Sequence, residues 1–197
     1  MKKLSVIAVV GMAVFGFQAC NDGGSEDAIK SANESNEVKQ DSAEHSETAP
    51  VSTVSEEDSK FAVEAASGGM MEVQLGELAQ QKAANQKVKD FGAMMVRDHS
   101  KANDDLKTIA GSKNITLPPA PGEDHMEHIK KLSEKSGKEF DKDYIKMMVD
   151  DHEKDIDHFE KCSKDAKDAE LKAFAAKTLP TLREHLAEAK KIWDVVK

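Results

Sequence analysis

Four residues that can bind a metal ion interrupt apolar, helically spaced stripes of the sequence: Glu72, His99, His152 and His185. One carboxylate and three imidazoles form a donor set that suits Zn²⁺, Fe²⁺, Mn²⁺ or Cu²⁺. Buried histidines can also be neutral structural groups, hydrogen-bonded to Glu72, to one another or to water, and such groups can fix the register of a bundle. The residue types therefore leave two interpretations open, a metal site and a structural polar layer.

The expected heights of these residues along their helices separate one of them from the other three. Glu72 and His99 are placed symmetrically about a predicted turn near Asn85 and should lie level. His152 lies about 11 residues before the next predicted turn and His185 about 18 after it, a mismatch of roughly 10 Å at about 1.5 Å per residue. We therefore predict that Glu72, His99 and His152 form one cluster and that His185 belongs to a different layer.

The residues around the histidines do not match a di-iron oxidase. Helical-bundle proteins of that kind use Glu on two helices and Glu-x-x-His on the other two. The residues three positions before His99, His152 and His185 are valine, valine and leucine. The adjacent carboxylates point about 100° away on a helix. We predict no catalytic residues, and the sequence has no nucleophile elbow, phosphate-binding glycine loop or zinc-type cysteine pair.

A hexapeptide occurs twice, as Met94-Met95-Val96-Arg97-Asp98-His99 and, 53 positions later, as Met147-Met148-Val149-Asp150-Asp151-His152. The repeat predicts two matched helices of related halves that face each other across a core. A methionine lies four residues before each histidine, on the same helix face. Thioethers beside imidazoles suit Cu(I), although methionine at this spacing usually fills a core.

Arg97 and Arg183 are the only arginines beside 26 lysines, and each lies within two residues of a candidate histidine. Arginine is preferred over lysine for partly buried, bidentate ion pairs. We predict that both arginines bind carboxylates, with Glu72 and Asp151 as candidates. Solvated surface positions are the alternative.

Long helices must position these residues. Helical periodicity predicts four of them, at about residues 56–84, 86–110, 138–163 and 168–196. Short turns within each pair of segments require antiparallel hairpins, and the glycines of the first segment, Gly76 among them, predict close approach of a neighbouring helix. The connection between the pairs includes a proline-rich stretch at 117–122, which excludes a helix, and a short amphipathic piece. Since an up-down bundle needs no such connection, we predict an all-α, ferritin-like four-helix bundle of two antiparallel hairpins joined by a long crossover with a short extra helix.

Six short motifs along the chain resemble, in the same order, the motifs of one known family. They are Ala65–Gly76, Met95–Asn103, Leu117-Pro118, Gly137–Tyr144, Met148–His152 and Leu179–Leu186. Together they resemble the domain-of-unknown-function 4142 family (DUF4142) over about residues 58–195. The resemblance implies a ferritin-like helical domain of exported bacterial proteins. It implies no established activity.

The start of the chain predicts export and a lipid anchor. A basic start and a short apolar run precede Ala19-Cys20, which is typical of a bacterial lipoprotein signal peptide over residues 1–19. Acylation of Cys20 would hold the protein in a membrane, facing the periplasm or the cell surface. An ordinary secreted protein with an incidental cysteine is the alternative.

Residues 20–55 are rich in Ser, Glu, Asp and Asn and contain no aromatic residue, so we predict a disordered acidic tether before a folded domain at 56–197. Without residues 1–19 the formal net charge changes from −9 to −11, which argues against nucleic acid as a partner. Cys162 is expected to be a buried, inert thiol.

The sequence thus favours a lipid-anchored envelope protein with a non-catalytic role in binding or envelope stress. The alternative is a metal-binding or metal-dependent redox protein that uses Fe, Zn or Cu at Glu72, His99 and His152, with His185 as a more distant fourth ligand.

Overall fold

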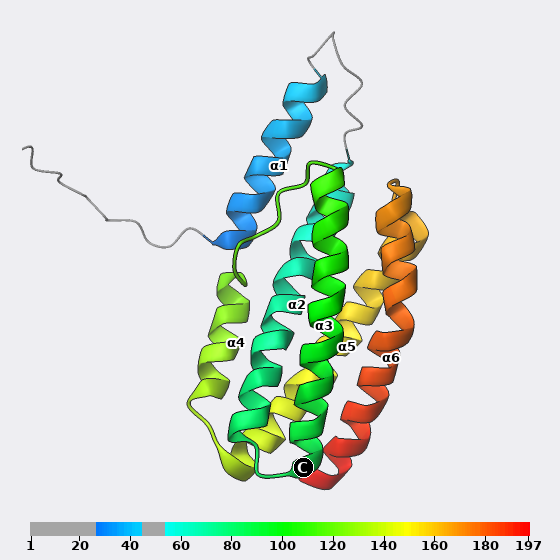
Figure 1. The fold of residues 1–197 in the computed structure, drawn as a ribbon. Helices are drawn as coiled ribbons and strands as arrows, with labels where there is room; N and C mark the ends of the chain where they lie inside the picture. Colours follow the sequence, from blue (N-terminus) through cyan, green and yellow to red (C-terminus); the bar gives the residue numbers. More distant parts are fainter. Residues whose placement is uncertain (1–26, 45–53) are drawn as a thin grey trace, which may run out of the picture.

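The computed structural model describes residues 27–44 and 54–197, and apart from one isolated backbone bridge the regular structure in these ranges is helical (Figure 1). The helices are α1 (Ala28–Glu44), α2 (Glu56–Lys82), α3 (Gln86–Ser112), α4 (Glu123–Ser133), α5 (Gly137–Asp165) and α6 (Ala169–Val196). The predicted all-α class is confirmed.

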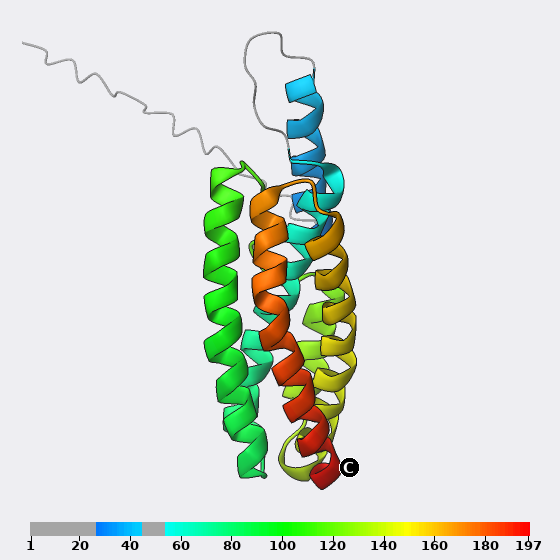
Figure 2. The same cartoon turned by 90° about the vertical axis from the view of Figure 1, so that its right-hand side faces the viewer.

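Helices α2, α3, α5 and α6 form a four-helix bundle of two antiparallel hairpins, α2–α3 and α5–α6 (Figures 1 and 2). The hairpins pack through α2 against α5 and through α3 against α6. The crossover after α3 includes α4, which lies beside α2 and returns the chain to the end of the bundle where α3 began. As a result α3 and α5 run in the same direction at diagonal positions, which is the predicted ferritin-like wiring.

Side-chain caps set where three of these helices begin. The Ser55 hydroxyl accepts a hydrogen bond from the third residue of α2, and the Asn85 side chain accepts from the second residue of α3. The Asp168 carboxylate accepts two backbone N–H groups in the first turn of α6. Each cap satisfies backbone donors that a helix start leaves without a partner, so the short turns can reverse the chain at defined residues.

Two buried aspartates join the hairpins to each other at opposite ends of the bundle. Asp141 of α5 accepts hydrogen bonds of 3.0 and 2.9 Å from the backbone N–H groups of residues 84 and 85, in the α2–α3 turn. Asp58 of α2 accepts bonds of 3.0 and 2.8 Å from residues 167 and 168, in the α5–α6 turn. We call Asp58 and Asp141 the reciprocal aspartates, because each binds the turn of the other hairpin.

The two hairpins are related by an offset of 83 positions, which separates both the reciprocal aspartates and the starts of α3 and α6. This offset matches α2 with α5 and α3 with α6. The repeated hexapeptide instead lies on α3 and α5, so the prediction that it marks matched helices of two halves is wrong. Its histidines do face each other across the core, with the ring centroids of His99 and His152 5.6 Å apart.

The prediction of a disordered tether over residues 20–55 is wrong for residues 28–44, which form α1. This helix packs against α2, with Ala32 and Asn36 each 3 % exposed. The Asn36 amide donates to the Thr116 carbonyl and accepts from the Thr116 N–H, at 3.0 and 2.7 Å. Polar docking on the crossover backbone thus orders a segment with few apolar residues.

The predicted signal peptide and Cys20 lie outside the described residues. Within the described part of the chain, no helix has the length and apolar character needed to cross a membrane.

Candidate functional site

A polar layer of one residue from each bundle helix divides the core. Its members are Glu72, His99, His152 and His185, and none is more than 6 % exposed. Apolar clusters lie on both sides, one towards the α5–α6 turn with Phe159 and Leu171 and one towards the α2–α3 turn with Phe91, Phe140 and Tyr144. The apolar packing on both sides holds the polar side chains in a water-poor interior.

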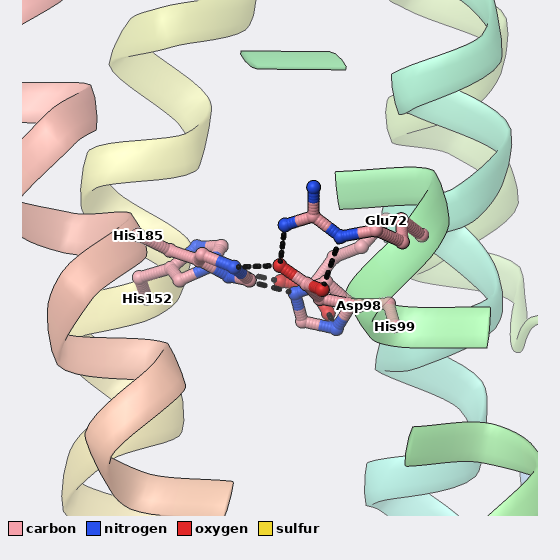
Figure 3. A network of polar contacts seen from close by, with 6 residues as sticks. Glu72, Asp98, His99, His152 and His185 are labelled. Atoms are coloured by element: carbon pink, nitrogen blue, oxygen red, sulfur yellow. Dashed lines mark hydrogen bonds and ion pairs between the residues drawn. The ribbon is translucent and has the colours of Figure 1, made fainter. Parts of the chain in front are cut away.

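Three imidazoles of this layer converge on a common point (Figure 3). His185 Nδ1 lies 3.3 Å from His99 Nε2 and 3.3 Å from His152 Nε2. One nitrogen from each ring lies within 4.8 Å of the other two. We call His99, His152 and His185 the tri-histidine cluster.

The prediction that His185 belongs to a different layer is wrong. Helix α5 continues to Asp165, so His152 lies 13 residues before the end of that helix, and His185 lies 16 residues after the first residue of α6. A difference of three residues corresponds to roughly 4.5 Å, less than half the predicted mismatch, and helix packing absorbs it. Half of the error in the predicted mismatch comes from the end of α5, which lies two residues later than predicted, and half from the start of α6, which lies two residues closer to His185 than the predicted turn.

The ring nitrogen of each histidine that faces away from the cluster contacts an oxygen atom. His99 Nδ1 lies 2.6 Å from Glu72 Oε2, and His152 Nδ1 lies 3.0 Å from the Met148 carbonyl oxygen. His185 Nε2 lies 3.1 Å from Asp98 Oδ2. A carbonyl oxygen or an ionised carboxylate at the outer nitrogen, as at His152 and His185, places the imidazole proton there and leaves the inner nitrogen with its lone pair.

Asp98 is held in place by Arg97 in a bidentate pair of 2.8 and 2.7 Å (Figure 3). The hydrogen bonds from Arg97 lower the pKa of Asp98, so this carboxylate stays ionised and accepts the His185 proton. The sequence predicted carboxylate partners for both arginines, but the candidates Glu72 and Asp151 were wrong. Arg183 instead pairs with Glu160, and both arginine side chains are exposed because their partners lie on the bundle surface.

Burial keeps the three imidazoles neutral at pH 7. It lowers the pKa of His99 and of His185 to about 4 and that of His152 well below its usual value. Each ring therefore carries one proton. For His185 that proton faces an ionised carboxylate and for His152 a carbonyl oxygen, so the inner nitrogens of both rings present lone pairs to each other.

Two lone pairs at 3.3 Å cannot form a hydrogen bond, whereas a shared cation would satisfy both. A metal ion bound at about 2.05 Å from nitrogens 3.3 Å apart subtends an angle of about 107°, close to tetrahedral. The contact between His99 and His185 has the same length and gives the same angle. The geometry and the proton positions therefore both fit a metal ion.

A second cluster of titratable groups adjoins the first on the other side of Glu72. Oxygens of Glu72, Asp151 and Asp155 lie within 4.8 Å of one another, and we call these residues the carboxylate cluster. Burial raises the pKa of Asp151 to about 6, and burial followed by the neighbouring carboxylates raises the pKa values of Glu72 and Asp155 well above their usual range. Sequence reasoning missed Asp155, although it follows Glu72 by the 83 positions that relate the two hairpins.

Three sulfur-containing residues considered in the sequence, Met95, Met148 and Cys162, lie in the apolar parts of the core. Met95 and Met148 belong to the cluster on the α2–α3 side. Cys162 is a buried free thiol in the other cluster, and burial raises its pKa to about 12. The expected burial of this thiol is confirmed, and its raised pKa is consistent with an inert group.

The fold and this centre define an all-α bundle protein with buried histidine and carboxylate clusters. A family model described as a domain of unknown function (DUF4142) matches residues 43–192, and the chain belongs to this family. Searches of curated proteins and of solved structures found no match.

Proposed function

We propose that this protein binds a divalent transition-metal ion at the tri-histidine cluster. The observation that carries the proposal is the contact of 3.3 Å between His152 Nε2 and His185 Nδ1, two nitrogens whose protons both lie on the opposite side of the ring. A neutral structural layer would need a donor between these atoms, and neither imidazole supplies one.

The outer contacts support the same conclusion. A histidine that binds a metal usually donates its other N–H to a carboxylate, a carbonyl or water, which fixes the ring and raises its basicity. His152 and His185 have such a partner, a carbonyl oxygen and an ionised carboxylate, and His99 contacts the carboxyl group of Glu72. Neutral imidazoles are also the form that binds metal, and burial already favours it.

The donor set favours borderline metal ions. Three imidazole nitrogens suit Zn²⁺, Cu²⁺ or Fe²⁺, and a tetrahedral ion would keep a fourth position for another ligand. Glu72 Oε1 lies 3.5 Å from His152 Nε2, and a small movement would bring this oxygen to the ion. Burial of all four side chains favours a binding role, such as metal storage or transfer at the cell envelope.

A cobalt titration tests the proposal on the full-length chain in detergent, purified without a polyhistidine tag and treated with chelator. Co²⁺ in a tetrahedral nitrogen site absorbs strongly in the visible range, and we expect these bands to saturate at about one ion per chain. His185→Gln should abolish the bands. His128→Gln, in a histidine of α4 outside the cluster, should leave them unchanged.

The proposal fails if the wild-type chain gives no such bands and retains less than about 0.2 metal ion per chain after treatment with Zn²⁺, Fe²⁺ and Cu²⁺. Far-ultraviolet circular dichroism of both variants distinguishes a lost ligand from a lost fold.

We also propose that the protein is held at a bacterial membrane by acylation of Cys20. The support is the signal-peptide pattern of residues 1–20, and more than one acyl chain would make the attachment stable.

A further inference from the structure

The three side chains of the carboxylate cluster are arranged like the ligands of a separate cation site. Asp151 and Asp155 are four residues apart on α5 and therefore share a face of the helix, and Glu72 approaches them from α2. Oxygens bound to opposite sides of a hard cation at about 2.3–2.6 Å lie about 4.6–5.2 Å apart. The three oxygens, all within 4.8 Å of one another, fit around such an ion without a backbone movement.

Unpaired buried oxygens provide a second and independent observation. Glu72 is 2 % exposed, and its Oε1 atom has no hydrogen-bond partner among the described residues. Asp151 Oδ2 is likewise buried without a partner within the described ranges. No lysine or arginine in residues 27–44 and 54–197 forms an ion pair with Asp151 or Asp155. A cation is the partner that buried carboxylate oxygens of this kind lack.

An acidic cavity gives access to this cluster from solvent. It has a volume of about 590 Å³, lies between α2, α4 and α5, and reaches Asp151 and Asp155. Its lining includes six carboxylates, Glu64 and Asp124 among them, but only one lysine. A neighbouring cavity of about 450 Å³ shares Asp151 but has four lysines in its lining. Since field lines of one sign concentrate in a cleft, the first cavity attracts cations to the carboxylates.

We propose that the carboxylate cluster is a second cation position, which takes a hard divalent cation such as Ca²⁺ or Mn²⁺ beside the metal ion of the tri-histidine cluster. This second proposal rests on the proposed function only through Glu72, which contacts both clusters. Carboxylate oxygens select hard cations and imidazole nitrogens select borderline ones, so the two positions prefer different ions. The protein would then hold two unlike ions side by side.

Binding of Mn²⁺ tests this second position, because electron paramagnetic resonance measures the free ion directly. The full-length wild-type chain should bind about one Mn²⁺, and Asp155→Asn should weaken binding by about tenfold or more. Asp157→Asn, in an exposed aspartate of the same helix, is the matched control and should bind like the wild type. His185→Gln should keep Mn²⁺ binding although it loses the cobalt bands.

The outcomes separate the two positions. A wild-type chain that gives the cobalt bands but binds neither Mn²⁺ nor Ca²⁺ overturns the second position and leaves the tri-histidine site intact. A chain that binds Mn²⁺ without giving the cobalt bands overturns the tri-histidine site and leaves the second position intact. If Asp155→Asn and Asp151→Asn both bind Mn²⁺ like the wild type, the ion is not at the carboxylate cluster. Both substitutions keep the side-chain shape, and retained cobalt bands show that each variant is folded.

Discussion

At the scale of single residues, the contact between Asp98 and His185 connects the surface of the bundle to its centre. Arg97 keeps the Asp98 carboxylate ionised and oriented, and that carboxylate keeps the His185 proton on Nε2. The lone pair of Nδ1 is thereby directed towards the other two imidazoles. In the proposed metal site Asp98 is therefore a positioning residue, which would act on a bound ion only through His185.

Replacement of Asp98 by alanine should lower the affinity for Co²⁺ by about 10- to 100-fold, as for other groups that orient a histidine ligand. The visible bands should keep their shape at saturation, because all three imidazoles remain. Titration of the bands measures both properties. Asp104→Ala, in an exposed aspartate of α3, serves as the control, and equal affinities of the two variants would contradict the role of Asp98.

The residues of the polar layer could be predicted because each interrupts an apolar stripe. Their partners could not be predicted in the same way. Asp98 points away from the face that carries His99, and only the position of α6 brings it to His185. Asp155 is a similar case, because its contact with Glu72 depends on how α2 and α5 pack.

At the scale of helices, α2 and α3 approach closely where Gly76 faces Gly92. A Cβ atom on Gly92 would lie 2.7 Å from both the Ala79 Cβ and the Gly76 carbonyl oxygen. The predicted close approach at Gly76 is therefore present. It brings Glu72 and His99, each about two turns or less from this contact, within hydrogen-bond distance.

Gly92→Ala should destabilise the bundle by about 1–3 kcal/mol, because the added methyl group meets backbone that cannot move without separating the helices. Gly111→Ala is the matched change in the same helix, and its Cβ would meet no atom of a neighbouring element within 4 Å. That variant should be more stable than the wild type by about 0.4–1 kcal/mol. Urea unfolding measures both, and a Gly92→Ala variant as stable as Gly111→Ala would show that the helices are not in tight contact.

At the scale of the whole molecule, the wiring could be predicted from the lengths of the connections. Two short turns and one long crossover restrict four helices to very few arrangements. Helix α1 could not be predicted, because it is ordered by contacts between Asn36 and the backbone at Thr116, which leave no periodic pattern in the sequence. The offset of 83 positions between the two hairpins could not be predicted either, because no repeated sequence motif marks it. It becomes visible only in the helix bounds and in the reciprocal aspartates.

The proposed lipid anchor is also tested on the whole molecule. Cells supplied with an alkyne-labelled fatty acid should incorporate the label into the wild-type chain, and the protein should fractionate with membranes. Cys20→Ser should lose the label and leave the membrane fraction. Wild-type protein that carries no label would show that Cys20 is not acylated.

The reciprocal aspartates have a consequence for the unfolding of the bundle. A separate α2–α3 hairpin would lack the carboxylate that binds its own turn, and it would carry Asp58 with no turn to bind. The α5–α6 hairpin is incomplete in the same way. The four hydrogen bonds of the reciprocal aspartates therefore form only when the two hairpins pack together, so they should be lost together when the hairpins separate.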